Sequence, residues 1–239
     1  MTQFKNRLDA GRQLTSEISK RLSGATVVLA ITPGGVGIGH ELALGVRAPL
    51  DIFLVHKVVA PGHEEMAIGC ITSRGARLLN ADAIANLGLS ERIVKRVVSE
   101  QEALLRDMER ELRASRPALD LRGRTVVLVD DGALTSTCMR AAVQAVRRTG
   151  PKAIIIALPV ASADTCRQLR TVADEVVCAY VPKRLLQISE CFGELPEMTA
   201  AEVSSLLGQN AHLAPRAEVA QLHWVEQVNA KTASDRNPT

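Results

Sequence analysis

Two adjacent carboxylates, Asp130 and Asp131, follow a short apolar run and precede a loop of small and hydroxyl residues. The run at 124–129 is rich in β-branched residues, which predicts a strand buried on both faces. After the loop at 132–138, apolar residues continue from Met139 at helical spacing. Carboxylates at the end of such a strand can accept hydrogen bonds from sugar hydroxyls or help to hold Mg²⁺ through water.

The loop itself predicts a phosphate site. A loop that leads into a helix N-terminus presents free backbone N–H groups at the positive end of the helix dipole. Its members are Gly132, Ala133, Leu134, Thr135, Ser136, Thr137 and Cys138. Together with the carboxylates, they predict a phosphorylated sugar as the ligand.

A second glycine-rich loop starts at Thr32, between a predicted strand at 26–31 and a helix that continues through Leu44. Glycines in this position let the backbone approach an anion closely. A P-loop is excluded because His40 and Glu41 stand where that motif has Lys followed by Ser or Thr, and the glycine spacing matches the dinucleotide fingerprint only loosely. A tight turn that packs the strand on the helix remains the structural alternative.

The elements that must position these loops alternate along the chain. Further strands are predicted at 51–59, 66–71, 153–160 and 175–181, and helices at 4–22, 162–173 and after the capping box of Thr199 and Glu202. A helix of about 25 residues begins after Ser90 and ends before Pro117. This order predicts an α/β fold: a mainly parallel, twisted sheet with helices on both faces and a long inserted helix.

The stretch 124–138 resembles the phosphoribosyl pyrophosphate (PRPP) motif of type I phosphoribosyltransferases. Other segments resemble one bacterial subfamily of that family, namely 4–12, 34–36, 48–51, 57, 60–62, 65–69 and 120–124. The resemblance covers about residues 4–207. It implies a protein that transfers phosphoribosyl from PRPP to a nucleobase or related nitrogen acceptor and releases pyrophosphate.

The resemblance also implies a role for each candidate residue. Asp130 and Asp131 hold the ribose and, with pyrophosphate, the Mg²⁺ cofactor, and Asp131 balances positive charge at C1. Lys57 offsets the charge of the pyrophosphate. The amides of the 132–138 loop, with the hydroxyls of Thr135 and Thr137, hold the 5′-phosphate. The pyrophosphate loop consists of Thr32, Pro33, Gly34 and Gly35, and the family's lid lies near the turn-rich segment 60–65.

Four departures from the family pattern keep a second hypothesis open. The 32–35 loop lacks the usual arginine, Ser136 replaces a loop glycine, Cys138 replaces a threonine, and the segment 184–192 retains a single aromatic ring. If the backbone at Ser136 needs a positive φ, the replacement costs about 1 kcal/mol. The alternative function is a catalytically silent relative that binds a nucleotide or phosphosugar as a regulator.

Composition excludes several classes of protein. The 239 residues carry 29 basic and 26 acidic side chains, for a net charge of +3, which leaves no strong nucleic-acid footprint. Aromatic residues make up 2%, too few for a base-stacking platform. No apolar run is long enough to span a bilayer, and the N-terminus lacks a signal-peptide core, so we expect a cytoplasmic protein.

Five cysteines at scattered positions form no metal-binding spacing, and we expect them to be reduced thiols. The apolar stripe of the long helix has to be covered by the core or by a second subunit, which makes a homodimer plausible. We expect a phosphoribosyltransferase-like domain at 1–207 with a helical insertion at 80–116. Residues 208–239 then form a C-terminal segment with a helix at 217–228 and a disordered end at 231–239.

Overall fold

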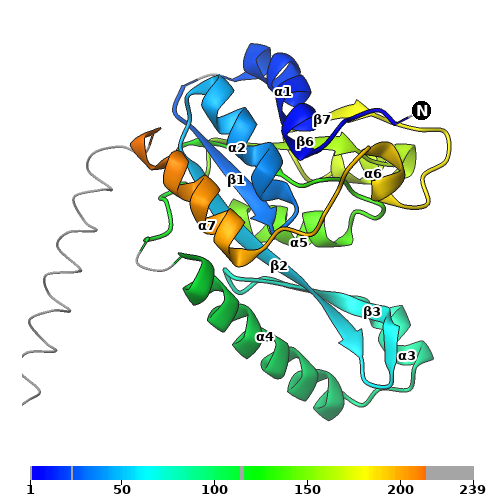
Figure 1. Cartoon of the computed structure of the whole chain (residues 1–239). Coiled ribbons are helices and arrows are strands. Elements are labelled where there is room, and N and C mark those ends of the chain that lie inside the picture. The colour runs from blue at the N-terminus through cyan, green and yellow to red at the C-terminus, as the bar shows by residue number, and fades with distance from the viewer. Residues whose placement is uncertain (1, 23, 114–115, 214–239) are drawn as a thin grey trace, which may run out of the picture.

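The computed structural model describes residues 2–22, 24–113 and 116–213. A seven-stranded sheet in the order β4-β3-β2-β1-β5-β6-β7 forms its centre (Figure 1). The parallel part contains β1 (Thr26–Thr32), β2 (Leu50–Ala60), β5 (Thr125–Val129), β6 (Ala153–Val160) and β7 (Glu175–Tyr180). The antiparallel edge contains β3 (His63–Thr72) and β4 (Arg77–Leu79). The predicted mainly parallel α/β fold is confirmed.

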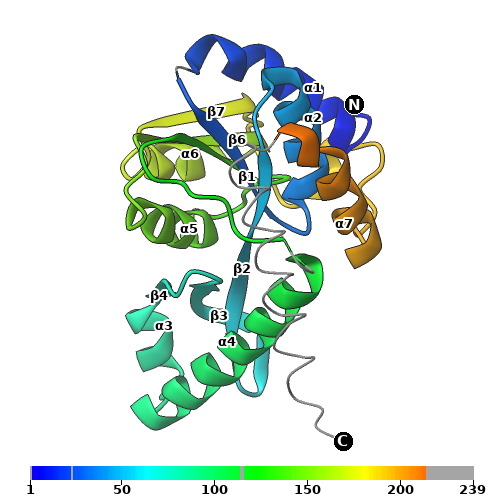
Figure 2. The same cartoon turned by 90° about the vertical axis from the view of Figure 1, so that its left-hand side faces the viewer.

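Helices cover both faces of the parallel part (Figure 2). One face packs against α1 (Arg7–Ile18), α2 (Gly35–Val46) and α7 (Ala200–Gln209), and the other against α5 (Thr137–Arg147) and α6 (Ala163–Leu169). In β1, Val28 belongs to the first core and Val27 to the second, as the alternation of strand side chains requires. Both faces are apolar because both are buried.

Strand β2 belongs to two kinds of pairing. Its first half pairs in parallel with β1 through Leu54, and its second half, from Val55, pairs antiparallel with β3. The resulting hairpin extends away from the parallel sheet (Figure 1). The loop predicted at 60–65 is therefore mostly strand: the turn is short, Gly62 takes the positive φ of 77° that it needs, and β3 begins at His63.

The long predicted helix is α4 (Glu91–Arg113), and its stripe is covered largely by this chain itself. Ser90 caps it by accepting a hydrogen bond from the Ile93 amide at 3.4 Å. Val94, Val98 and Leu105 on the inner side belong to the core beneath β2 and β3. A short helix, α3 (Ala81–Asn86), precedes α4 and was not predicted.

The last α-helix of the described chain is α7, whose predicted capping box is present and which a 3-10 helix at Ala211–Leu213 follows. Thr199 accepts from the Glu202 amide at 3.2 Å, and the Glu202 carboxylate accepts from the Thr199 amide at 2.7 Å. The helix predicted at 217–228 and the disorder predicted at 231–239 lie outside the described residues, and the domain boundaries remain predictions. Within the described ranges, no helix combines the length and apolarity needed to cross a membrane.

Candidate active site

The carboxyl end of β5 opens into a cavity of about 540 Å³. Its lining includes residues of the 32–35 loop, Lys57, both carboxylates and residues of the 132–138 loop. The predicted residues that line it are Pro33, Gly34, Lys57, Asp130, Asp131, Gly132, Ala133, Leu134, Thr135 and Cys138. A cavity of this size lies within the range of small-molecule sites. Parallel strands β1 and β5 are neighbours, so the loops that follow them meet at one edge of the sheet.

The loop after the carboxylates presents unpaired amides toward the start of α5. Within the described chain, the amides of residues 134–138 donate to no protein acceptor, and Ser136 at the N-cap makes no side-chain capping bond. The Ala133 amide is different, since it donates to the Val160 carbonyl at 3.0 Å. The part of the predicted loop that offers free amides is therefore 134–138, at the positive end of the α5 dipole.

Ser136 does not strain this loop as the sequence had suggested. Its φ is −79° in the right-handed region, so no glycine is needed there. Its buried hydroxyl donates to Oε1 of Gln168 on α6 at 2.5 Å, and Thr165 on the same helix donates to the Leu134 carbonyl at 2.8 Å. These bonds to α6 hold the loop and aim its amides at the cavity.

Asp130 and Asp131 lie side by side at the end of β5. The Asp131 amide donates to Oδ1 of Asp130 at 2.9 Å. Burial raises the pKa of the Asp130 carboxyl well above its ordinary value, and the charge of Asp131 raises it further, while Arg7 and Lys57 oppose this shift. The neutral form of Asp130 is therefore favoured, and hydroxyl donors or a cation would stabilise its ionised form.

Arg7, at the start of α1, is a site residue that sequence reasoning missed. Its Nη2 donates to Oδ2 of Asp131 at 2.9 Å, and its Nη1 donates to the Pro196 carbonyl. The side chain is only 13% exposed and lines the cavity beside Gly34. Residues 7 and 131 are 124 positions apart, so nothing in local spacing could have paired them.

The glycines of the second loop are required by close packing. A Cβ on Gly34 would lie 2.4 Å from Oδ2 of Asp131, and one on Gly35 would lie 2.4 Å from the Val129 carbonyl oxygen. Gly35 therefore acts as the tight-turn residue of the structural alternative, whereas Pro33 and Gly34 face the cavity. Lys57, exposed on the antiparallel half of β2, also lines the cavity.

Three predicted residues whose side chains the structure describes are absent from the lining of the cavity. They are Gly35 and Ser136, both buried in packing contacts, and Thr137, the first residue of α5. Residues that were not predicted complete the lining: Arg7, Ile31, Val55, Met139, Ile188, Glu197 and Met198. The unpredicted apolar residues carried no distinguishing pattern, because an apolar residue at a strand end looks the same whether it faces a cavity or a core.

Two of the five cysteines contradict the expectation of reduced thiols. Cys70 on β3 and Cys138 in the first turn of α5 form a disulfide, with their Cα atoms 5.5 Å apart. The two residues are 68 positions apart, and only the packing of α5 against β3 brings them together. Cys166, Cys178 and Cys191 are free. Cys138 is thus a structural tether between the phosphate loop and the hairpin.

The segment after β7 covers one side of the cavity with aliphatic rather than aromatic groups. Ile188 and Met198 line it, and a Cβ on Gly132 would lie 2.7 Å from Cδ1 of Ile188. The single ring of this segment, Phe192, instead packs on Phe4 with centroids 5.3 Å apart. The site therefore has no aromatic cover from this segment.

A magnesium ion fits the donors at this edge only together with a ligand. Among the residues that the structure describes, no three His, Cys, Asp or Glu side chains converge on one point. Mg²⁺ is usually held by one or two carboxylates plus substrate phosphates, which is the donor set that Asp130, Asp131 and a diphosphate would provide.

Comparisons with known proteins give a consistent result. Residues 1–183 match the model of the phosphoribosyl transferase domain. The chain is 32% identical over 207 residues to "Putative phosphoribosyl transferase Rv0571c" of Mycobacterium tuberculosis H37Rv, and the same figures hold for MT0597 of strain CDC 1551. These matches cover 87% of this chain and 47% of each relative, so the chain spans about half the length of the curated relatives it matches.

A solved structure matches over nearly the whole described chain. The crystal structure of TT1426 from Thermus thermophilus is 33% identical with a TM-score of 0.75. The alignment covers 88% of this chain and 100% of that one. Many further solved structures match as well.

Proposed function

Because this chain belongs to the phosphoribosyl transferase domain family, we propose that it transfers the phosphoribosyl group of PRPP to a nitrogen acceptor, such as a nucleobase, and releases pyrophosphate. The observation that carries the proposal is the edge of the sheet at β5. There, two carboxylates stand beside an uncapped helix N-terminus whose amides at 134–138 have no protein acceptor within the described chain. Carboxylates suit ribose hydroxyls, and free amides suit a 5′-phosphate.

The proposed reaction breaks the bond between ribose C1 and the pyrophosphate oxygen and forms one from C1 to the acceptor nitrogen. Positive charge develops at C1 as the pyrophosphate leaves, and the acceptor gives up its proton. Asp131 stabilises that charge, and the loop 134–138 fixes the sugar by its phosphate. The protein contributes mainly positioning and electrostatics.

Arg7 brings a positive charge to the proposed pyrophosphate site. The 32–35 loop lacks the arginine usual in the family, but the guanidinium of Arg7 lies against Asp131 and lines the cavity with Gly34, where the pyrophosphate would enter. Together with Lys57 it would offset the charge of the leaving group. When PRPP binds with Mg²⁺, Asp130 and Asp131 would help to hold the metal ion, and the ion would offset the negative charge of the pyrophosphate.

The quaternary state is part of the proposal. We expect a homodimer through the outer side of α4, where Leu104 is 55% exposed and Met108 is 44% exposed. These side chains lie one turn apart, so they form a continuous apolar strip. Leu105, on the inner side of the same helix, is buried within the chain.

The test measures pyrophosphate released from PRPP and Mg²⁺ with a panel of nucleobases. Asp131→Asn should lower kcat by about 100-fold or more, because a lost electrostatic contact in the transition state has effects of this size. Asp82→Asn, at an exposed position on α3 outside the cavity, is the matched control and should leave the rate unchanged. Unchanged turnover in Asp131→Asn would remove the assigned role.

A silent relative is the second candidate, favoured by the Arg7–Asp131 ion pair that occupies the carboxylate in the structure. Calorimetric titration separates the two. PRPP that binds the wild type with Mg²⁺ but is never cleaved, with any base, would establish a binding protein. Arg7→Gln should weaken PRPP binding under either function, since both need its charge.

A further inference from the structure

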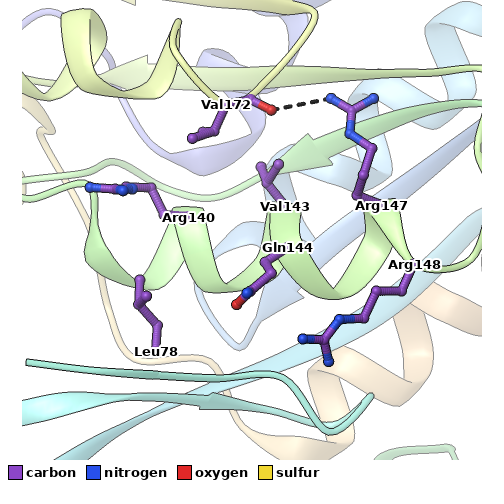
Figure 3. A pocket seen from close by; sticks show the side chains of 7 residues that line it. All are labelled: Leu78, Arg140, Val143, Gln144, Arg147, Arg148 and Val172. Atoms are coloured by element: carbon purple, nitrogen blue, oxygen red, sulfur yellow. Dashed lines mark hydrogen bonds between the residues drawn. The ribbon is translucent and has the colours of Figure 1, made fainter.

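A second cleft, of about 480 Å³, lies on the outer side of α5 (Figure 3). Its lining consists of Leu78 on β4, Val172 after α6, and five residues of or adjoining α5: Arg140, Val143, Gln144, Arg147 and Arg148. None of these residues lines the cavity at β5. The cleft is therefore a second cavity, although both cavities use residues of α5.

All the charged side chains that line this cleft are basic. Three of its lining side chains are arginines and none is acidic. Arg147 donates to the Asp174 carboxylate at 2.8 Å and to the Val172 carbonyl at 3.1 Å. The dashed line in Figure 3 marks the bond to Val172. Arg140 and Arg148 are exposed and make no side-chain hydrogen bond or ion pair with any described residue. Two guanidinium groups thus remain available for a ligand.

Helix stability explains only part of this arrangement. Arg147 and Arg148 lie at the C-terminal end of α5, where cations are favourable. Arg140 is the fourth residue of the helix, near the positive end of the dipole, where a cation is unfavourable. Figure 3 shows Arg140 at one end of the cleft and Arg148 at the other, with Val143 and Gln144 between them. The stability of α5 therefore does not explain the arginine at position 140.

The floor of the cleft is apolar. Val143 is buried there, and Leu78 and Val172 are half-buried beside it. Arg140 and Arg148 are eight residues apart, which corresponds to about 12 Å along the helix. A matching ligand has an apolar, planar part over the valine and leucine and negative charge at one end. A guanidinium binds phosphate through its fork of N–H donors and also stacks on aromatic faces.

We propose that this cleft binds a nucleoside polyphosphate. Arg148, with Arg147 beside it, takes the phosphates, and the base lies over Val143 and Leu78 within reach of the Arg140 guanidinium. Gln144 offers an amide to the sugar or the base. The site would bind its nucleotide while the cavity at β5 is occupied by another ligand, since the two share no lining residue.

The test is calorimetric titration of the full chain with ATP as the probe at low salt. The double variant Arg140→Gln/Arg148→Gln should weaken ATP binding by about tenfold or more, the size expected for lost charge-assisted hydrogen bonds. Arg92→Gln/Arg122→Gln removes the same net charge from exposed positions outside the cleft and should bind like the wild type. All four arginines are exposed, so unchanged thermal unfolding is expected in both variants.

Two further titrations separate this site from others. Asp131→Asn should bind ATP like the wild type, and saturating PRPP should not displace it. The proposal would be overturned if ATP binding were lost in Asp131→Asn or displaced by PRPP. It would also be overturned if Arg140→Gln/Arg148→Gln left ATP binding unchanged, or if ATP showed no saturable binding at all. Tripolyphosphate should bind more weakly than ATP; equal affinity would overturn the assignment of a nucleoside.

Discussion

At the scale of residues, the main feature is a pair of carboxylates that the backbone holds together at the end of β5. Burial and the charge of Asp131 raise the pKa of Asp130, so the folded protein holds this proton more tightly than the unfolded chain does. The free energy of unfolding therefore decreases as pH rises from the ordinary carboxyl pKa through the raised one. The ionised Asp130 carboxylate therefore lowers the free energy of unfolding, and we expect a bound ligand to reduce this cost.

Asp130→Asn should make the protein more stable at neutral pH and weaken its binding of Mg²⁺-PRPP. Asparagine keeps the shape of the side chain without its charge, so the gain should disappear in acid, where Asp130 is protonated anyway. Thermal unfolding between about pH 4 and about pH 8 measures this, with about 2–4 °C expected per kcal/mol for a chain of this size.

Asp174→Asn is the control, because its effect on the free energy of unfolding at neutral pH should be opposite to that of Asp130→Asn. Burial pushes the pKa of Asp174 up, but hydrogen bonds from Arg147 and the Ile154 amide hold it below its ordinary value. Its contribution to stability is present above the unfolded pKa and is lost as pH falls through the folded one. The variant should therefore be less stable at neutral pH. An Asp130→Asn protein that melts below the wild type at neutral pH would contradict the assignment.

At the scale of elements, a buried ion pair joins the end of α4 to the start of β2. Arg113, at the end of α4, donates to Oδ1 of Asp51 at 2.6 Å and to the Ile52 carbonyl at 2.8 Å, and its Nε donates to Glu109 at 2.7 Å. The Leu119 amide donates to the other Asp51 oxygen at 2.9 Å. The carboxylate at the start of β2 thus fixes where the long helix ends.

Arg113→Met should lower the free energy of unfolding by about 3–5 kcal/mol, because it leaves the buried Asp51 charge without its partner. Arg110→Met breaks the exposed pair with Asp107 on the same helix and should cost at most about 1 kcal/mol. Chemical denaturation measures both. The double variant Asp51→Asn/Arg113→Met should recover part of the loss; if it is no more stable than Arg113→Met, the buried charge is not the cause.

At the scale of the whole molecule, the hairpin, α3 and α4 lie to one side of the parallel sheet, and the site lies where β2 passes from one part to the other. Lys57 comes from the antiparallel half of β2, and the disulfide joins β3 to α5. The position of the hairpin therefore affects the cavity from two sides. A dimer through α4 would hold that part of the molecule in place.

Leu104→Glu/Met108→Glu should convert the proposed dimer into a monomer, because it places charges in the apolar strip of α4. Light scattering after size-exclusion chromatography gives the mass directly. Leu186→Glu, at a side chain 57% exposed elsewhere on the molecule, is the control and should stay dimeric. A wild-type protein that is monomeric at all concentrations tested would rule out the interface.

Much of the fold and part of the site could be predicted from local patterns. The central parallel strands were recognisable because a strand buried on both faces is a continuous apolar run, as in Thr125–Val129. The cap at Ser90 and the capping box at Thr199 marked helix starts correctly, since a cap acts within a few residues. The short strand β4 and helix α3 escaped because neither carries a long enough periodic pattern.

By itself, the sequence determined the order of strands and helices, the acidic pair at a strand end and the glycine loop, because these depend on neighbouring residues. Only the tertiary structure decided that Arg7 pairs with Asp131, that Cys70 joins Cys138 and that Ser136 fits without strain. The first two contacts join residues far apart in the chain, and the third depends on how α6 holds the loop. Such contacts follow from how whole elements pack, which local residue spacing does not encode.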